Sequence, residues 1–243
     1  MFVDIEELKA NFETFLALLA QEEIVIQRDG QTIARLEAVP EFLAAPAPFK
    51  LSETAKPYEP WPRRATYEEF LELTNSDEQQ FEYIDGEIYL MTSPRVIHQS
   101  VLGALHRIFV DWLDGKGCQV FFAPLDITLR RTATDINVVQ PDLMVICDLD
   151  QHLGSKGQYT GIPLLLVEIL SESTRSKDSL KKFDLYAATG IAEYWIINPL
   201  SREISVMRFE KGRLADGRIS GAGESAASMV LHGLSVDIDQ LFR

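Results

Sequence analysis

The sequence lacks features that would each mark a particular class of protein. It holds only two cysteines in 243 residues, Cys118 and Cys147, too few for a disulfide framework, and this favours reduced cysteines in a cytoplasmic compartment. No apolar run is long enough to span a bilayer. The first residues, MFVDIEELKANFETF, are acidic and amphipathic, unlike a signal peptide. We therefore expect a cytoplasmic protein with no membrane partner.

Positive charge is also scarce. The net charge is −14, which argues against a protein that holds nucleic acid non-specifically through a positive surface. It does not exclude an enzyme that acts on nucleic acid. Acids that bind a divalent cation make a chain look acidic, and the bound cation restores a local attraction for phosphate.

The chain has no internal repeat and no low-complexity tract, but its composition changes along its length. Residues 46–64 hold five prolines and no periodic pattern, which indicates a stiff, extended linker. This linker separates a module at residues 1–45 from a longer body at residues 65–243. With 46% hydrophobic residues, the chain can bury a core.

The module at residues 1–45 combines a helical pattern with a hairpin pattern. Apolar residues recur at three- and four-residue steps before residue 20, as in an amphipathic helix. The segment EEIVIQRDGQTIARLEAV then alternates on both sides of Asp29-Gly30, which is a hairpin signal. Residues 1–40 resemble the N-terminal half of the prevent-host-death (Phd/YefM-type) antitoxins. The resemblance implies dimerisation and operator binding; a small α+β docking or dimerisation module is the alternative.

The body predicts an α/β arrangement. Thr66 and Glu69 form a capping box before a short helix, and Asp85-Gly86 is the turn of a hairpin. Two longer helices are expected in HQSVLGALHRIFVDWLDGKG and KDSLKKFDLYAATG, with strand-like runs before, between and after them. This order of elements favours a mixed central sheet flanked by helices.

Three acidic residues lie at positions where the charge of the carboxylate needs a compensating partner. Glu168 lies inside the apolar run PLLLVEIL, and an ionised carboxylate buried there costs several kcal/mol unless something pairs with it. Asp142 follows Pro141 at the head of another apolar strand, and Glu82 faces away from its neighbours in the first strand of the hairpin. Clustered carboxylates repel one another, so they need a cation. Oxygen ligands of this kind suit Mg²⁺ or Mn²⁺.

A positive side chain is expected beside these acids. If a helix starts near Ser176, then Asp178, Lys182 and Tyr186 lie on one face of it. Lys182 then leans toward the end of the Glu168 strand, where an ammonium group can orient an attacking water or stabilise charge on phosphorus. A structural ion pair of Glu168 with Arg175 or Lys182 is the alternative.

The motifs around these acids carry a second resemblance. Pro141-Asp142 and VEIL at residues 167–170 look like the PD-(D/E)XK nuclease superfamily. The segments FEYIDGEIYLMTSPRVIHQ, QPDLMVI and LLLVEILSESTRSKDSLKKFDLYAATGIAEYWIINP resemble one restriction-endonuclease-like family within it. The resemblance covers residues 65–243 and implies a restriction-endonuclease-like fold, with Glu82, Asp142 and Glu168 as Mg²⁺ ligands. Leu170 stands where the superfamily has its lysine, and Lys182 takes that role.

These observations lead to one hypothesis and one alternative. The hypothesis is a Mg²⁺-dependent endonuclease acting on nucleic acid, most naturally DNA, with Glu82, Asp142, Glu168 and Lys182 as catalytic residues. The side chains of His98, Asp178 and Tyr186 are expected around the ligands or the substrate. Cutting both strands of a duplex favours a homodimer. The alternative is a non-catalytic regulator that keeps the nuclease fold and binds DNA or a partner.

Overall fold

The computed structural model describes residues 2–4, 7–8, 24–28, 31–36, 61–76, 79–155, 157–171 and 178–243. The chain divides into two compact units, Met1–Tyr58 and Glu59–Arg243. The boundary falls inside the segment expected to be a linker, and the last residues of that segment belong to the second unit. Arg63 and Arg64 form strand β4 and pair with strand β6 (Glu87–Leu90).

The first unit contains a three-stranded sheet. Strand β1 (Phe2–Asp4) runs parallel to β2 (Ile24–Arg28), and β2 pairs antiparallel with β3 (Gln31–Leu36). Val3, Leu8, Ile24 and Ile26 form a small buried core. The two expected hairpin strands are therefore present. The turn at Asp29-Gly30 and most of the expected helix lie outside the described residues, and the antitoxin resemblance stays a prediction.

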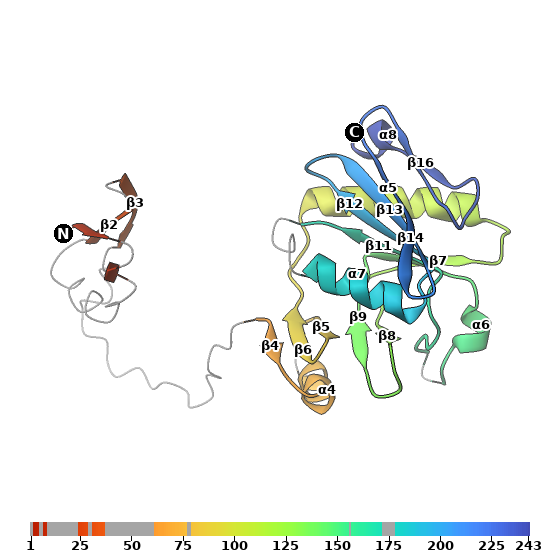
Figure 1. Ribbon diagram of the computed structural model, residues 1–243, viewed down its shortest axis with the longest axis horizontal. Coiled ribbons are helices and arrows are strands. Elements are labelled where there is room, and N and C mark those ends of the chain that lie inside the picture. The colour runs from red at the N-terminus through yellow and green to blue at the C-terminus, as the bar shows by residue number, and fades with distance from the viewer. Residues whose placement is uncertain are drawn as a thin grey trace. The chain divides into compact units, whose positions relative to one another are not determined.

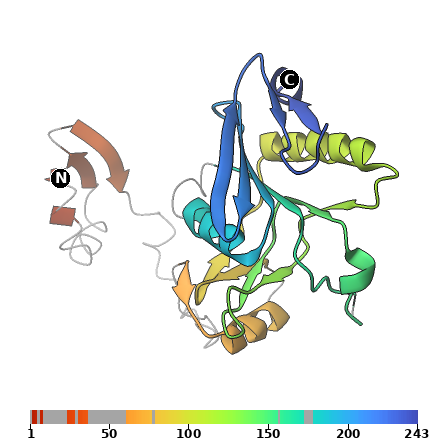
Figure 2. The same cartoon turned by 45° about the vertical axis from the view of Figure 1, so that its right-hand side comes forward.

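A six-stranded mixed sheet forms the centre of the second unit (Figures 1 and 2). Its order is β14-β13-β12-β11-β10-β7, and only β11 and β12 run parallel. The strands are β7 (Gln119–Phe122), β10 (Leu143–Ile146), β11 (Leu165–Ile169), β12 (Glu193–Asn198), β13 (Glu203–Glu210) and β14 (Arg213–Ser220).

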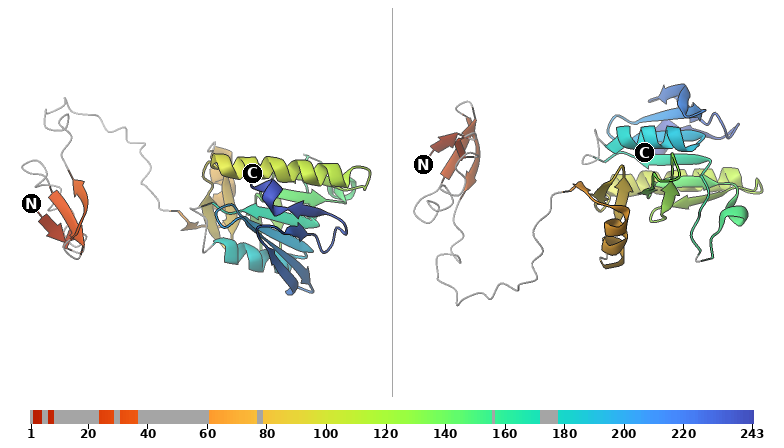
Figure 3. Two further views of the ribbon diagram at one scale, coloured as in Figure 1. Left: turned by 90° about the horizontal axis from the view of Figure 1, so that it is seen from above. Right: turned by 60° about the horizontal axis from the view of Figure 1, so that its bottom comes forward.

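Two long helices cover opposite faces of this sheet. Helix α5 (Val96–Leu113) shares a core with Leu165 and Val167 of β11, whereas α7 (Asp178–Thr189) shares one with Leu166. Side chains alternate along a strand, so these two cores lie on the two faces of the sheet. Seen from above, α5 runs along one side of the strands (Figure 3, left). The alternation also turns Glu168 toward α7.

A five-stranded sheet, ordered β4-β6-β5-β9-β8, lies on the α7 side. It contributes Ile84, Ile127 and Val139 to the core that α7 shares. Its remaining strands are β5 (Phe81–Ile84), β8 (Ile127–Leu129) and β9 (Asn137–Val139), and helix α4 (Tyr67–Ser76) packs against it. The Asp85-Gly86 turn joins β5 to β6 as expected.

The capping box before α4 is also confirmed. The Glu69 Oε2 atom accepts from Thr66 N–H at 2.7 Å, and Thr66 Oγ1 accepts from Glu69 N–H at 3.2 Å. These reciprocal bonds satisfy two backbone donors that a helix start would otherwise leave without a partner. The sequence pattern therefore fixed this helix start locally.

The C-terminal segment is tied to the sheet by a buried acid. It contains strands β15 (Ser225–Ala227) and β16 (Ser235–Asp237) and helix α8 (Ile238–Leu241); a short helix α6 (Leu149–His152) follows β10. Glu193 at the start of β12 is fully buried and accepts hydrogen bonds from Trp195 Nε1–H, the Ser228 hydroxyl and two backbone N–H groups. No pattern in the sequence indicated this role of Glu193.

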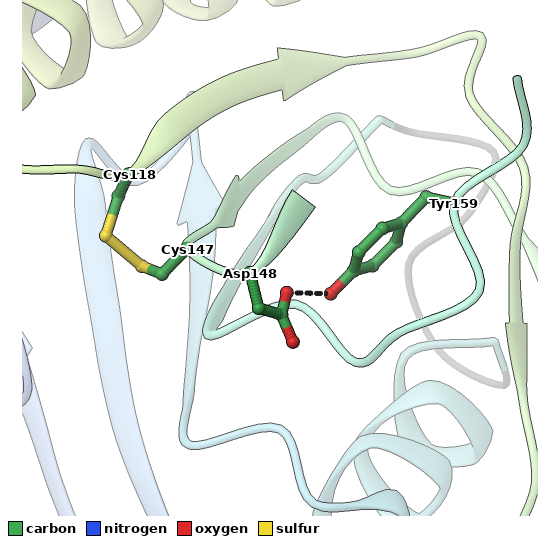
Figure 4. Close-up of a disulfide and its surroundings, with 4 residues drawn as sticks. All are labelled: Cys118, Cys147, Asp148 and Tyr159. Atoms are coloured by element: carbon green, nitrogen blue, oxygen red, sulfur yellow. Dashed lines mark hydrogen bonds between the residues drawn. A yellow bond between two sulfur atoms is a disulfide. The ribbon is translucent and has the colours of Figure 1, made fainter. Parts of the chain in front are cut away.

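The expectation of two reduced cysteines is wrong. Cys118 and Cys147 form a disulfide at the ends of β7 and β10 (Figure 4). The antiparallel register pairs Gln119 with Ile146, so the next residue outward on each strand lies directly opposite the other. The residue after Cys147, Asp148, accepts a hydrogen bond from the Tyr159 hydroxyl at 2.7 Å. Sequence spacing alone could not reveal this pairing, because it depends on the strand register.

None of the helices in the described parts of the chain combines the length and the apolar character needed to cross a bilayer.

Candidate active site

Four of the residues singled out in the sequence meet in one cavity. Glu82 comes from β5, Asp142 from the turn before β10, Glu168 from β11 and Lys182 from α7, and all four line a cavity of about 1030 Å³. The antiparallel pairing of β10 with β11 sets Leu143 opposite Val167, which places Asp142 and Glu168 at the same end of the pair. The tertiary fold thus assembles the set from segments far apart in the chain.

Lys182 lies between two of the acids. Its Nζ atom is 2.8 Å from Glu82 Oε1 and 2.9 Å from Glu168 Oε1. Lys182 and Glu82 are both buried, so each charge depends on the other for compensation. The Gln140 N–H also donates to Glu82 Oε1 at 2.8 Å. Glu168 therefore has the ion-pair partner that the alternative expected, and its role as a metal ligand stays a prediction.

Asp142 is fixed by two groups. Its Oδ2 accepts from Ile169 N–H at 2.7 Å, and its Oδ1 lies 3.1 Å from His98 Nε2. Burial lowers the pKa of His98, but the hydrogen bond and charge of Asp142 and the charge of Glu168 outweigh it, so the pKa is raised overall. His98, in the first turn of α5, thus contacts an acid of the cavity.

The other expected residues lie on α7. The Tyr186 hydroxyl donates to Glu168 Oε1 at 2.8 Å, one helical turn beyond Lys182. A helix was expected to start near Ser176, which lies outside the described residues; helix α7 is described from Asp178, whose side chain is outside the described part of the structure. Lys181 points elsewhere and donates to Glu87 Oε2 at 2.5 Å and to the Tyr89 hydroxyl at 2.6 Å.

The electrostatics of the cavity show an excess of negative charge around Glu168. Burial raises the pKa of Glu168, Lys182 lowers it, and the carboxylates of Asp142 and Glu82 raise it again; the net pKa is about 7. Burial lowers the pKa of Lys182, but the charges of Glu168 and Glu82 hold it above its usual range. One ammonium group therefore does not fully compensate three clustered carboxylates.

The chemistry of the cavity fits a divalent cation of the Mg²⁺ type. All the acidic donors are oxygens, and Mg²⁺ takes one or two carboxylates while keeping several waters. Gln140 also lines the cavity, and its buried Oε1 atom accepts no hydrogen bond in the described structure. As the side chains stand, the described residues contain no group of three or more acids, histidines or cysteines arranged around a metal position; Lys182 contacts the two glutamates instead.

Gln140 is a residue that the sequence reasoning missed. Its Nε2 donates to Asp126 Oδ1 at 2.8 Å. A carboxylate can only accept, so this contact fixes the amide nitrogen on that side and leaves Oε1 as an acceptor. A signal was available, because Gln140 directly precedes Pro141-Asp142 at the end of a buried strand.

Comparisons with known proteins point to one family. The pattern of Uma2, described as "Putative restriction endonuclease", matches residues 67–239. An uncharacterized protein of Synechocystis sp. is 30% identical over 189 residues, which is 77% of this chain and 95% of that protein. A crystal structure from Anabaena variabilis, described as a "putative nuclease belonging to DUF820", aligns with a TM-score of 0.57 and 21% identity over 72% of this chain and 96% of that one. This likeness confirms the restriction-endonuclease-like α/β fold.

Proposed function

The chain belongs to the Uma2 family of "Putative restriction endonuclease" proteins, and on this premise we propose that it is a Mg²⁺-dependent endonuclease that hydrolyses phosphodiester bonds of DNA. One observation carries the proposal. Glu82, Asp142 and Glu168 come together beside Lys182 in one cavity, with the pKa of Glu168 raised to about 7. Titratable groups perturbed by burial and by specific charges in a cleft are typical of active sites.

Each residue has a role that follows from its contacts. Glu82, Asp142 and Glu168 would hold the cation, which when bound supplies a Lewis acid for a phosphoryl oxygen and lowers the pKa of water. The backbone N–H of Ile169 and the His98 ring fix the orientation of the Asp142 carboxylate, and the Tyr186 hydroxyl does the same for Glu168.

Lys182 would act directly on the reacting groups. Its ammonium group reaches both glutamates from α7, so it lies where it can orient the attacking water or stabilise charge developing on phosphorus. Leu170 also lines the cavity but is apolar and cannot fill that role. Helix α7 therefore supplies, through Lys182, the positive charge that Leu170 at the end of strand β11 does not.

The test is a cleavage assay with the full chain. Mixed DNA and RNA substrates are incubated with Mg²⁺ or Mn²⁺, and Asp142→Ala serves as the matched inactive control. We expect the wild type to produce fragments only with the cation, and Asp142→Ala to produce none. Equal cleavage by both proteins would indicate a contaminating nuclease and would contradict the proposed site.

One observation favours a second function, a non-catalytic regulator that binds DNA or a partner. Lys182 pairs with both Glu82 and Glu168, and the described residues show no group of acids, histidines or cysteines arranged around a metal position. In that case Lys182, Glu82 and Glu168 form an ion-pair network that only stabilises the fold, and the protein binds nucleic acid without cutting it. Retained binding with no cleavage under any cation would support this alternative.

A further inference from the structure

The cavity extends well beyond the acids, along helix α5. Five residues of that helix line it, His98, Gln99, Leu102, Gly103 and His106, together with Phe122 of strand β7. Residues four and three apart lie on one face of a helix, so Gln99, Gly103 and His106 form a single stripe. His98, which contacts Asp142, belongs to the same helix. This arm of the cavity therefore starts beside the proposed catalytic centre.

Gly103 is not explained by the fold itself. It lies in the middle of the 18-residue helix α5, where glycine is less favourable than alanine because its backbone loses more entropy. A Cβ atom at this position would meet no other atom within 4 Å, so packing does not require glycine. Because glycine has no side chain, the cavity at this position is larger by the space that the methyl group of an alanine would fill.

Phe122 is the second unexplained feature. It is 51% exposed although it is a large aromatic side chain, and it lies in the cavity. The His106 ring contacts it edge to face, with ring centroids 5.0 Å apart. This contact braces the phenyl ring from one side, and the exposed remainder is available to another flat group.

We propose that Gly103 and Phe122 form a subsite that stacks one nucleobase next to the scissile phosphate. The inference rests on the proposed nuclease function and names its substrate class: single-stranded DNA, or DNA with an unpaired base at the cleavage position. An aromatic side chain stacks on any base and gives binding without sequence preference. The space over Gly103 lets the base approach the helix closely.

Duplex DNA fits this subsite less well. Its bases are already stacked on their neighbours, and extruding one costs the free energy of its stacking and pairing. The acidic character of the chain points the same way, because the net charge of −14 provides little general attraction for a duplex backbone. Binding must then draw on contacts other than phosphate, and an accessible base supplies one.

The test measures affinity separately from cleavage. The full chain carrying Glu168→Gln binds fluorescein-labelled single-stranded DNA in Mg²⁺, and fluorescence anisotropy compares an intact oligonucleotide with one that has a single abasic site. We expect the abasic site, placed in turn at each position, to lower affinity at one register by roughly 5- to 150-fold, as loss of one stacked base does. Phe122→Ser should cause a similar loss, and the two changes together should cause little more than either alone.

Gly103→Ala gives a readout that a structural glycine would not give. Alanine should raise Tm by about 1–4 °C through its helix propensity, and it should weaken binding of the intact oligonucleotide severalfold because it fills the subsite. Leu200→Ser is the control for Phe122→Ser, since Leu200 is 57% exposed and lies outside the cavity lining. It should leave affinity unchanged.

The outcomes separate the two proposals. Equal affinity for intact and abasic DNA in every register, or unchanged affinity in Phe122→Ser, overturns the stacking subsite. If the wild type still cleaves these oligonucleotides in Mg²⁺, the proposed function survives that failure. If no nucleic acid is cut while binding depends on the base and on Phe122, the nuclease proposal fails and the subsite stands as a binding site.

Discussion

Lys182 and Glu168 form a 2.9 Å ion pair that joins helix α7 to strand β11 in the wall of the cavity. The same ammonium group also contacts Glu82. Such a pair can be a stabilising contact, part of an active site, or both. The difference is measurable, because a structural pair affects only folding, whereas an active-site lysine affects turnover even when the fold is intact.

The first prediction concerns Lys182→Met, which keeps most of the side-chain volume and removes the charge. It leaves Glu82 and Glu168 buried without their cation, so we expect a loss of about 3–5 kcal/mol of unfolding free energy in the apo protein. Adding Glu168→Gln should recover part of that loss by removing one of the unpaired charges. Denaturant unfolding of both variants tests this.

Turnover distinguishes the two roles of Lys182. Because the ammonium group is proposed to act on the transition state, the folded Lys182→Met protein should cleave orders of magnitude more slowly than the wild type. Unchanged turnover per folded molecule, together with the large stability loss, would show that the pair is structural only.

The second prediction concerns the cation. Mg²⁺ or Mn²⁺ should relieve repulsion among the three carboxylates and stabilise the folded protein by about 2.7 kcal/mol at 100 times its Kd, a rise in Tm of roughly 5–10 °C. Thermal melting with and without the cation measures it. Asp142→Ala should abolish the rise, and an equal rise in both proteins would place the cation elsewhere.

The third prediction concerns Glu193, which lies outside the cavity lining. Its carboxylate accepts from Trp195, Ser228 and the backbone at 229 and 230. Glu193→Ala leaves these buried donors without an acceptor, so we expect a loss of at least about 3 kcal/mol of unfolding free energy. Ser228→Ala should cost less. Turnover per folded molecule should remain that of the wild type in both variants. Lower turnover would mean that the hydrogen bonds to Glu193 also affect the shape of the cavity.

The fourth prediction concerns acid stability. The hydrogen bond from Arg131 holds the pKa of Asp135 below its usual range, against the opposing effect of burial. A carboxylate with a lowered folded-state pKa stabilises the protein above its unfolded pKa, near 3.9, and loses that contribution as pH falls through the folded value. Asp135→Asn should therefore flatten the fall in Tm below about pH 4. A fall as steep as that of the wild type would rule out this contribution.

The fifth prediction is the homodimer. Two active sites related by a two-fold axis would cut both strands of a duplex. We expect the first unit to provide an additional contact between the two chains of the dimer. Light scattering at micromolar concentration should give twice the mass of one chain. A monomeric mass would contradict the homodimer; it would not bear on the subsite at Phe122, which is tested separately by binding.

Several local features could be predicted because their causes are local. Thr66 and Glu69 are three residues apart, so their reciprocal cap follows from helix geometry. The Asp85-Gly86 turn follows from backbone preference. The face of α7 that carries Lys182 and Tyr186 follows from four-residue spacing, and both side chains do contact Glu168. The helical and strand periodicities of the sequence therefore identified which side chains could come into contact.

The disulfide and the hydrogen bonds to Glu193 could not be predicted in the same way. Cys118 and Cys147 face each other only because β7 pairs with β10 in one register. Trp195 is two residues from Glu193, but the other three donors to Glu193, on Ser228, Met229 and Val230, lie 35 or more residues further along the chain. Each depends on which strands are neighbours, and no local pattern encodes that choice.

By itself, the sequence determined the α/β class, the start of α4, the Asp85-Gly86 turn and the residue types of the candidate site, because periodicity, caps and turns depend on neighbours a few residues apart. The tertiary structure decided that Lys182 lies between Glu82 and Glu168, that His98 contacts Asp142, and that Phe122 opens into the same cavity. Sheet order and register set these distances, and they arise from packing between segments distant in the chain.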